Sequence, residues 1–108
     1  MLRDLCAEVT PGVEPTLHVG IGDPAGQLID ISAEQDAGAI VVGSRGRGRV
    51  TAAILGSVSV EVVHRARCPV VIVPPDLPAH TLSSGPIVCG VDGSEESLAA
   101  ADLGAGLP

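Results

Sequence analysis

The feature that most limits the fold is a pair of short apolar runs, each of which follows a segment with a helical pattern. The runs cover residues 39–42 and 70–73, and the helical patterns cover residues 24–37 and 57–67. A strand that is apolar at every position is usually buried on both faces. Strands that alternate with helices form parallel sheets. The sequence therefore predicts an α/β fold, a parallel sheet with helices on both faces.

The helix predicted over residues 24–37 carries signals at both ends. Asp23 suits the cap, Pro24 suits the first helical position, and Gly38 suits a left-handed end. The apolar spacing predicts inward positions in both helices. These are Leu28, Ile29 and Ala33 in the first, and Val58, Val62, Val63 and Ala66 in the second.

Weaker patterns fill the rest of the chain. We expect a short helix over 2–9, a strand over 16–19 and a turn over 20–23. The proline-rich segment 74–86 indicates a linker. A strand over 87–91, a turn over 92–94 and a helix from residue 95 follow, with two acids in the first turn where the helix dipole favours them.

Composition excludes several classes of protein. With 108 residues, of which 45% are apolar, the chain is expected to fold as one domain at most. Its net charge of −7 argues against a general nucleic-acid-binding protein, and no apolar run approaches the length that crosses a membrane. Three scattered cysteines suit reduced thiols, which favours a cytoplasmic location.

A glycine-rich segment follows the strand predicted over 39–42. It reads Gly43-Ser44-Arg45-Gly46-Arg47-Gly48-Arg49 and leads to a helix that opens with Gly56-Ser57. Ligands of parallel α/β sheets bind at the carboxyl ends of strands, and backbone N–H groups at a helix start hold phosphate. Ser57 suits either a helix cap or a phosphate contact, and the arginines suit phosphate charge. The pattern alone leaves two alternatives open, a phosphate site or an arginine-rich turn without a ligand.

These residues resemble the universal stress protein family. Its ATP-binding subgroup carries the motif G-x2-G-x9-G-S/T, which Gly43, Gly46, Gly56 and Ser57 match without a gap. Residues 40–42, 55–59 and 68–74 also resemble the family, and the turn over 91–94 resembles the end of its first strand.

The resemblance implies an adenine nucleotide as ligand, namely ATP with or without Mg²⁺. It places ribose and phosphates on the glycine-rich loop and adenine near Asp92. The implied loop residues are Gly43, Ser44, Arg45, Gly46, Arg47, Gly48, Gly56, Ser57 and Val58.

The order of segments departs from the family pattern. Residues 1–73 resemble the C-terminal part of one family domain, 74–86 a linker, and 87–108 the first strand and helix of a second copy. We therefore expect an incomplete or rearranged fold. A linker of this length extends to about 43 Å, so residues 87–108 could complete the sheet within one chain or by exchange between two.

Three functions remain open at this point. The first is a nucleotide-binding regulatory module of the stress response that is not an enzyme, and the second is an interaction or dimerisation domain of the same fold. The third is a slow ATPase. In each case we expect a homodimer or larger oligomer, because an incomplete sheet exposes apolar edges.

Overall fold

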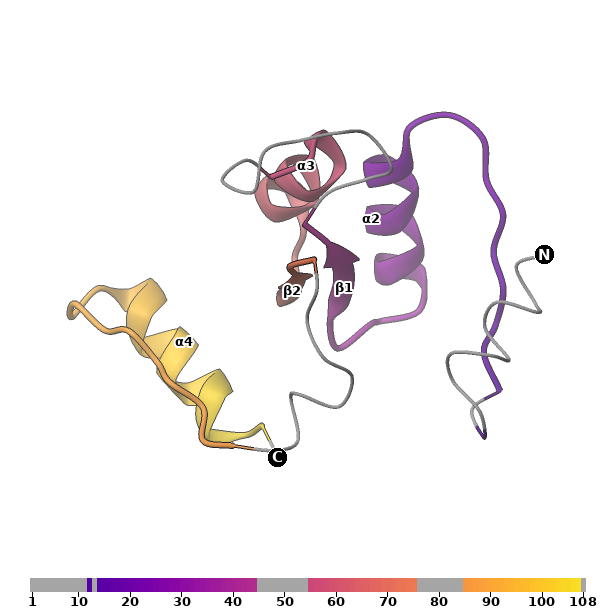
Figure 1. The fold of residues 1–108 in the computed structure, drawn as a ribbon. Helices are drawn as coiled ribbons and strands as arrows, with labels where there is room; N and C mark the ends of the chain where they lie inside the picture. The colour runs from indigo at the N-terminus through magenta and orange to yellow at the C-terminus, as the bar shows by residue number, and fades with distance from the viewer. Residues whose placement is uncertain (1–11, 13, 45–54, 76–84, 108) are drawn as a thin grey trace. The chain divides into compact units, whose positions relative to one another are not determined.

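The computed structural model describes residues 12, 14–44, 55–75 and 85–107. Its elements are α2 (Pro24–Glu34), β1 (Ile40–Gly43), α3 (Ser57–Arg65), β2 (Val70–Val73) and α4 (Glu95–Ala105) (Figure 1). They belong to two compact units, Met1–Pro75 and Asp76–Pro108. The helix predicted over 2–9 lies outside the described residues, as does most of the predicted linker.

β1 and β2 form a parallel two-stranded sheet. Ile40 pairs with Val70 and Gly43 with Val73, and the Ser44 N–H extends the ladder by donating to the Val73 carbonyl at 2.8 Å. The strand predicted over 70–73 has the expected bounds, whereas β1 begins one residue later than predicted. The α/β class and the parallel sheet are thus confirmed.

The core of the first unit lies between this sheet and the helices α2 and α3. Ala25, Ile40 and Val62 are buried, and Val42 packs against them. Because alternate residues of a strand share a face, both helices cover the face that carries Ile40 and Val42. On the opposite face Val41 remains 63% exposed. Within the described residues, helices therefore cover one face of the sheet rather than both.

α2 begins at Pro24 as predicted but ends earlier. The left-handed residue after it is Asp36, with φ of 50°, and not Gly38. Ala33 is exposed, so its predicted inward position is wrong, and Ala25 is buried instead. Leu28 and Ile29 are partly buried, in agreement with the prediction.

α3 differs at one position from the set of inward residues that the sequence predicts. Val62 is fully buried, but Val63 is 48% exposed, so the prediction for Val63 is wrong. Ser59 takes a buried position that the apolar pattern could not indicate. Its hydroxyl donates to the Gly43 carbonyl at 2.6 Å, which satisfies the polar group and allows its burial.

The strands predicted over 16–19 and 87–91 are not formed. Both segments are extended chain without regular structure, and Val19 and Val88 are 86% and 91% exposed. A strand is held by hydrogen bonds to a neighbouring strand, and the only ladder among the described residues joins β1 to β2. Val19, Val88 and Val91 therefore remain exposed.

The second unit consists of α4 and the segment before it. Gly93, with φ of 90°, forms the predicted turn, and the Ser94 hydroxyl caps α4 by accepting from the Ser97 N–H at 3.2 Å. A Cβ at Gly104 would clash with Cys89 Sγ, so the chain before α4 lies close against this glycine. Nowhere in the described part of the chain is there a helix long and apolar enough to cross a membrane.

Candidate functional site

The candidate site lies where β1 ends and α3 begins. The Gly56 N–H donates to the Ser44 carbonyl at 2.6 Å, and the Ser59 hydroxyl donates to the Gly43 carbonyl. These two bonds join Gly43 and Ser44, the first two residues of the glycine-rich segment, to the start of α3. The described part of the segment is therefore fixed at the carboxyl end of a parallel strand, beside a helix start.

The start of α3 has the geometry that binds anions. Gly56 is the cap residue, with φ of −66° and ψ of 159°, and the first intrahelical bond runs from the Val60 N–H to the Gly56 carbonyl at 3.1 Å. The N–H groups of the three preceding residues are directed out of the helix start. No acid stands in the first turn, so nothing there opposes the positive end of the helix dipole.

The structure brings together five of the nine predicted loop residues. Gly43, Ser44, Gly56, Ser57 and Val58 meet at this junction. Because Gly56 is the cap, Ser57 is the first helical residue and does not cap α3 as one alternative predicted. Arg45, Gly46, Arg47 and Gly48 lie outside the described residues, so their part in the site stays a prediction.

Asp92 belongs to the second unit, where its carboxylate stabilises a turn. One carboxylate oxygen accepts from the Ser94 N–H at 2.9 Å, and the Asp92 N–H donates to the Ser97 hydroxyl at 3.3 Å. The hydrogen bonds from Ser94 lower the pKa of Asp92 to about 2. An open hollow beside it is lined by Gly90, Val91 and Glu96. The predicted contact of Asp92 with adenine remains a prediction, and its structural role was not foreseen.

The lowered pKa of Asp92 makes this turn sensitive to acid. We expect a titration midpoint near 2 rather than the ordinary 3.8. Because the pKa of Asp92 is lower in the folded chain than in the unfolded chain, the carboxylate stabilises the turn fully at a pH above the ordinary pKa of 3.8. This contribution declines as the pH falls toward 2. Carbon NMR of the carboxyl group measures the midpoint. Ser94→Ala should raise it, Ser32→Ala in the other unit should not, and an unshifted midpoint in the native chain would contradict the assignment.

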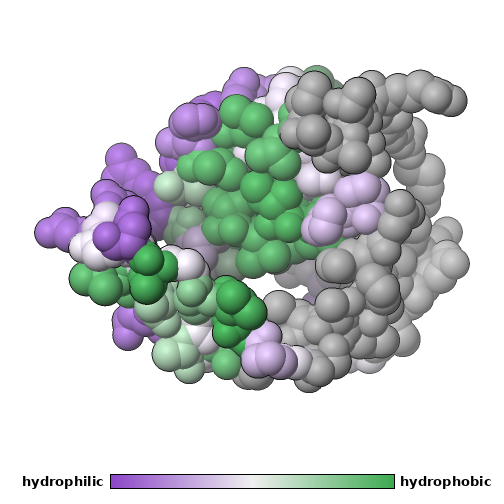
Figure 2. Space-filling model, turned by 60° about the vertical axis from the view of Figure 1, so that its left-hand side comes forward, coloured by the Kyte–Doolittle hydropathy of each residue, from purple (hydrophilic) through white to green (hydrophobic). Residues whose placement is uncertain are grey.

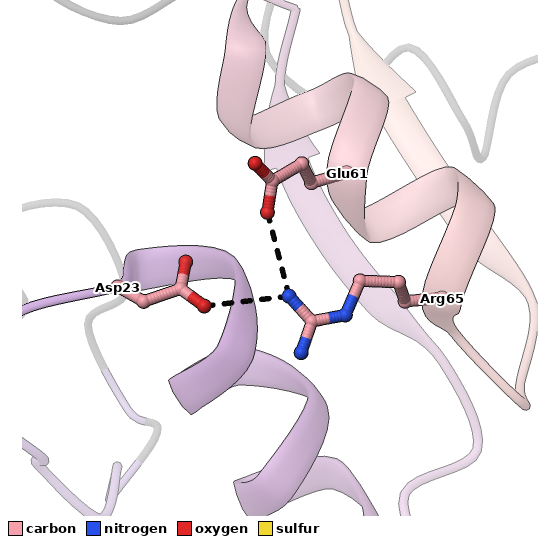
Figure 3. Close-up of polar contacts among 3 residues, drawn as sticks. All are labelled: Asp23, Glu61 and Arg65. Atoms are coloured by element: carbon pink, nitrogen blue, oxygen red, sulfur yellow. Dashed lines mark hydrogen bonds and ion pairs between the residues drawn. The ribbon is translucent and has the colours of Figure 1, made fainter.

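A second polar cluster joins α2 to α3. Arg65 Nη1 lies 3.3 Å from Asp23 Oδ2 and 3.4 Å from Glu61 Oε2 (Figure 3). Asp23 makes no capping hydrogen bond, although the nearby Gly26 N–H, and then Arg65, lower the pKa of its carboxyl group. The side chains are 47–57% exposed, and such surface pairs contribute at most about 1 kcal/mol. This cluster therefore connects the two helices.

Comparison with known proteins decides the family. The sequence model of the universal stress protein family matches residues 2–74. The chain belongs to this family. It is 43% identical over 68 residues to a universal stress protein of Mycobacterium tuberculosis, an alignment that covers 59% of this chain and 20% of the relative. A second one from that organism is 39% identical over 79 residues, which is 68% of this chain and 25% of the relative.

A universal stress protein of Mycolicibacterium smegmatis is similar over a longer stretch. It is 37% identical over 92 residues, covering 85% of this chain and 31% of the relative. An alignment of that length cannot fit within residues 2–74, so it extends into the second unit. The chain thus spans less than a third of the length of these curated relatives. No solved structure matches the sequence.

Proposed function

We propose that this chain is a regulatory module that binds ATP or a related adenine nucleotide through its glycine-rich loop. The observation that carries the proposal is the junction of β1 and α3, where Gly56 N–H is bonded to the Ser44 carbonyl at 2.6 Å. This junction brings a helix start to the carboxyl end of a parallel strand, the position at which α/β proteins hold phosphate. Family membership supports a role for the module in the response to stress.

Each part of the loop has a chemical task in this proposal. The N–H groups at the start of α3 and the Ser57 hydroxyl donate to phosphate oxygens, while Arg45 and Arg47 balance their charge. Mg²⁺ would arrive bound to the phosphates, because it retains several waters and needs few protein ligands. Among the described residues no group of three or more acidic, histidine or cysteine side chains is placed to hold a metal.

The absence of aromatic residues provides a direct test. The polypeptide absorbs almost nothing in the adenine band, so the ultraviolet spectrum of the purified, desalted chain reports bound nucleotide. We expect an adenine band after the chain is soaked with ATP and desalted, and its release on denaturation. A flat spectrum, together with no heat of binding in calorimetry, would contradict the proposal.

We further propose that the module acts by binding rather than by turnover. A phosphate-release assay separates this from the slow ATPase. If the native chain released phosphate steadily above a blank without protein, and Ser57→Ala did not, the chain would be a slow ATPase and the binding proposal would be wrong. An interaction domain is the second candidate, and the uncovered sheet face with Val41 and Val71 favours it.

A further inference from the structure

The interior of the first unit holds one polar side chain among the residues that the structure describes. Its core consists of Ala25, Ile40 and Val62, and apolar side chains also gather at the surface of the described residues (Figure 2). Ser59 is the buried polar residue, and it is 2% exposed. Burial of a hydroxyl among apolar groups is costly unless the hydroxyl is hydrogen-bonded. The reason for a serine at this position therefore lies in the bond that it makes.

Ser59 holds a carbonyl group that the sheet does not hold. β1 donates to β2 from the N–H groups of Ile40 and Ser44. Because alternate residues of a strand are directed to the same neighbouring strand, Gly43 directs its backbone groups away from β2. The Ser59 hydroxyl, 2.6 Å from the Gly43 carbonyl oxygen, is the donor that this carbonyl bonds instead.

Two hydrogen bonds therefore fix the end of β1 to the start of α3. The Gly56 N–H donates to the Ser44 carbonyl at 2.6 Å, and the Ser59 hydroxyl donates to the neighbouring Gly43 carbonyl. One bond comes from the residue before α3 and the other from its third residue. Together they restrict the distance between β1 and α3 and the rotation of α3 about its axis. The N–H groups at the start of the helix keep one direction as a result.

We propose that Ser59 is a positioning residue of the phosphate site, an inference that rests on the function proposed above. Its hydroxyl has one proton, which is bonded to the Gly43 carbonyl, so the Ser59 side chain does not itself donate to phosphate. It holds the Gly43 carbonyl oxygen, which repels an anion, against α3 and keeps the N–H groups of the helix start aligned. A site that is ordered before the ligand arrives loses less free energy on binding.

Calorimetric titration of the full chain with ATP tests this role. We expect Ser59→Ala to lower the affinity about tenfold, as the loss of one hydrogen bond does, and Ser59→Thr, which keeps the hydroxyl, to restore it. Ser32→Ala is the matched control, because the Ser32 hydroxyl also donates to a backbone carbonyl, that of Ile29 at 2.7 Å, but within α2. It should bind ATP like the native chain. Far-ultraviolet circular dichroism checks that each variant keeps its helices, and Ser59→Cys, a weaker donor, replaces Ser59→Ala if that variant loses them.

Carbonyl-carbon NMR of the chain without nucleotide separates positioning from a general loss of stability. We expect the Gly43 carbonyl resonance to move in Ser59→Ala and to keep its native position in Ser32→Ala. An unmoved resonance in Ser59→Ala, or an equal loss of ATP affinity in Ser32→Ala, would overturn the positioning role.

The two readouts together distinguish this inference from the proposed function. If the resonance moved but Ser59→Ala bound ATP as tightly as the native chain, the positioning role would be wrong and the proposed function would stand. If the resonance moved but the native chain bound no ATP, the bond would exist, and the proposed function would fail together with the positioning role.

Discussion

Replacing Gly56 by valine is expected to lower the affinity for ATP at least about tenfold, which corresponds to roughly 1.4 kcal/mol of binding free energy. Gly56 caps α3 with φ of −66° and ψ of 159°, a conformation that valine also adopts. The backbone therefore tolerates the substitution. The added side chain stands at the helix start, where the proposed site needs the phosphate to approach backbone N–H groups closely. Calorimetric titration with ATP measures the loss.

Gly38→Val is the matched control for this experiment. A Cβ at Gly38 meets no atom within 4 Å, and Gly38 lies before β1, at the opposite end of the strand from the loop. We expect this variant to bind ATP like the native chain. Gly46→Val should behave like Gly56→Val if the loop holds phosphate. Equal affinities in all four proteins would remove the glycine-rich loop from the site and leave the interaction domain as the function.

The parts of the fold that sequence predicts well are those fixed by local chemistry. Pro24 sets φ for a first helical turn and lacks the N–H that a helix interior needs, so the start of α2 could be placed correctly. The bounds of β2 follow from four apolar residues between two prolines, Pro69 and Pro74. In both places a proline sets the boundary of the element through its own local conformation.

Positions that depend on distant contacts were predicted less well. Val63 and Val62 are equally apolar, and only the packing of α3 against Ala25 and Ile40 decides which of them is buried. The segments 16–19 and 87–91 have strand-like patterns, but a strand forms only beside another strand. An alternating apolar pattern indicates that a segment favours the strand conformation, but a strand forms only where a neighbouring strand supplies hydrogen bonds.

In the candidate site, too, features fixed by local sequence were predicted and features that depend on distant contacts were not. Sequence spacing placed Gly43, Gly56 and Ser57 at one end of the sheet, because a strand and the helix that follows it must meet there. Spacing could not show that the hydroxyl of Ser59 is bonded to Gly43, since that bond depends on how α3 sits on β1. Nor could it show that the Asp92 carboxylate accepts a hydrogen bond from the Ser94 N–H and so stabilises the turn before α4.

Replacing Val62 by aspartate is expected to unfold the first unit. Val62 is the largest fully buried side chain in the described part of the chain, and its neighbours Ala25 and Ile40 offer no hydrogen bond to a carboxylate. Burial of an unpaired charge costs several kcal/mol, a large fraction of the total stability of a small domain. Far-ultraviolet circular dichroism should show loss of helix at room temperature. Val62→Ala should be milder, because it removes two buried methyl groups and costs about 2 kcal/mol.

Val63→Asp is the control that makes this prediction specific. Val63 precedes the last two residues of the same helix and is 48% exposed, so its aspartate can remain in water. We expect it to change the free energy of unfolding by less than about 1 kcal/mol. The two variants have the same composition and charge and differ by one position in α3. If Val63→Asp unfolded the chain and Val62→Asp did not, α3 would be turned about its axis relative to the sheet, and Ser59 could no longer reach the Gly43 carbonyl. The junction of β1 and α3 and the core of the first unit therefore depend on the same orientation of α3 about its axis.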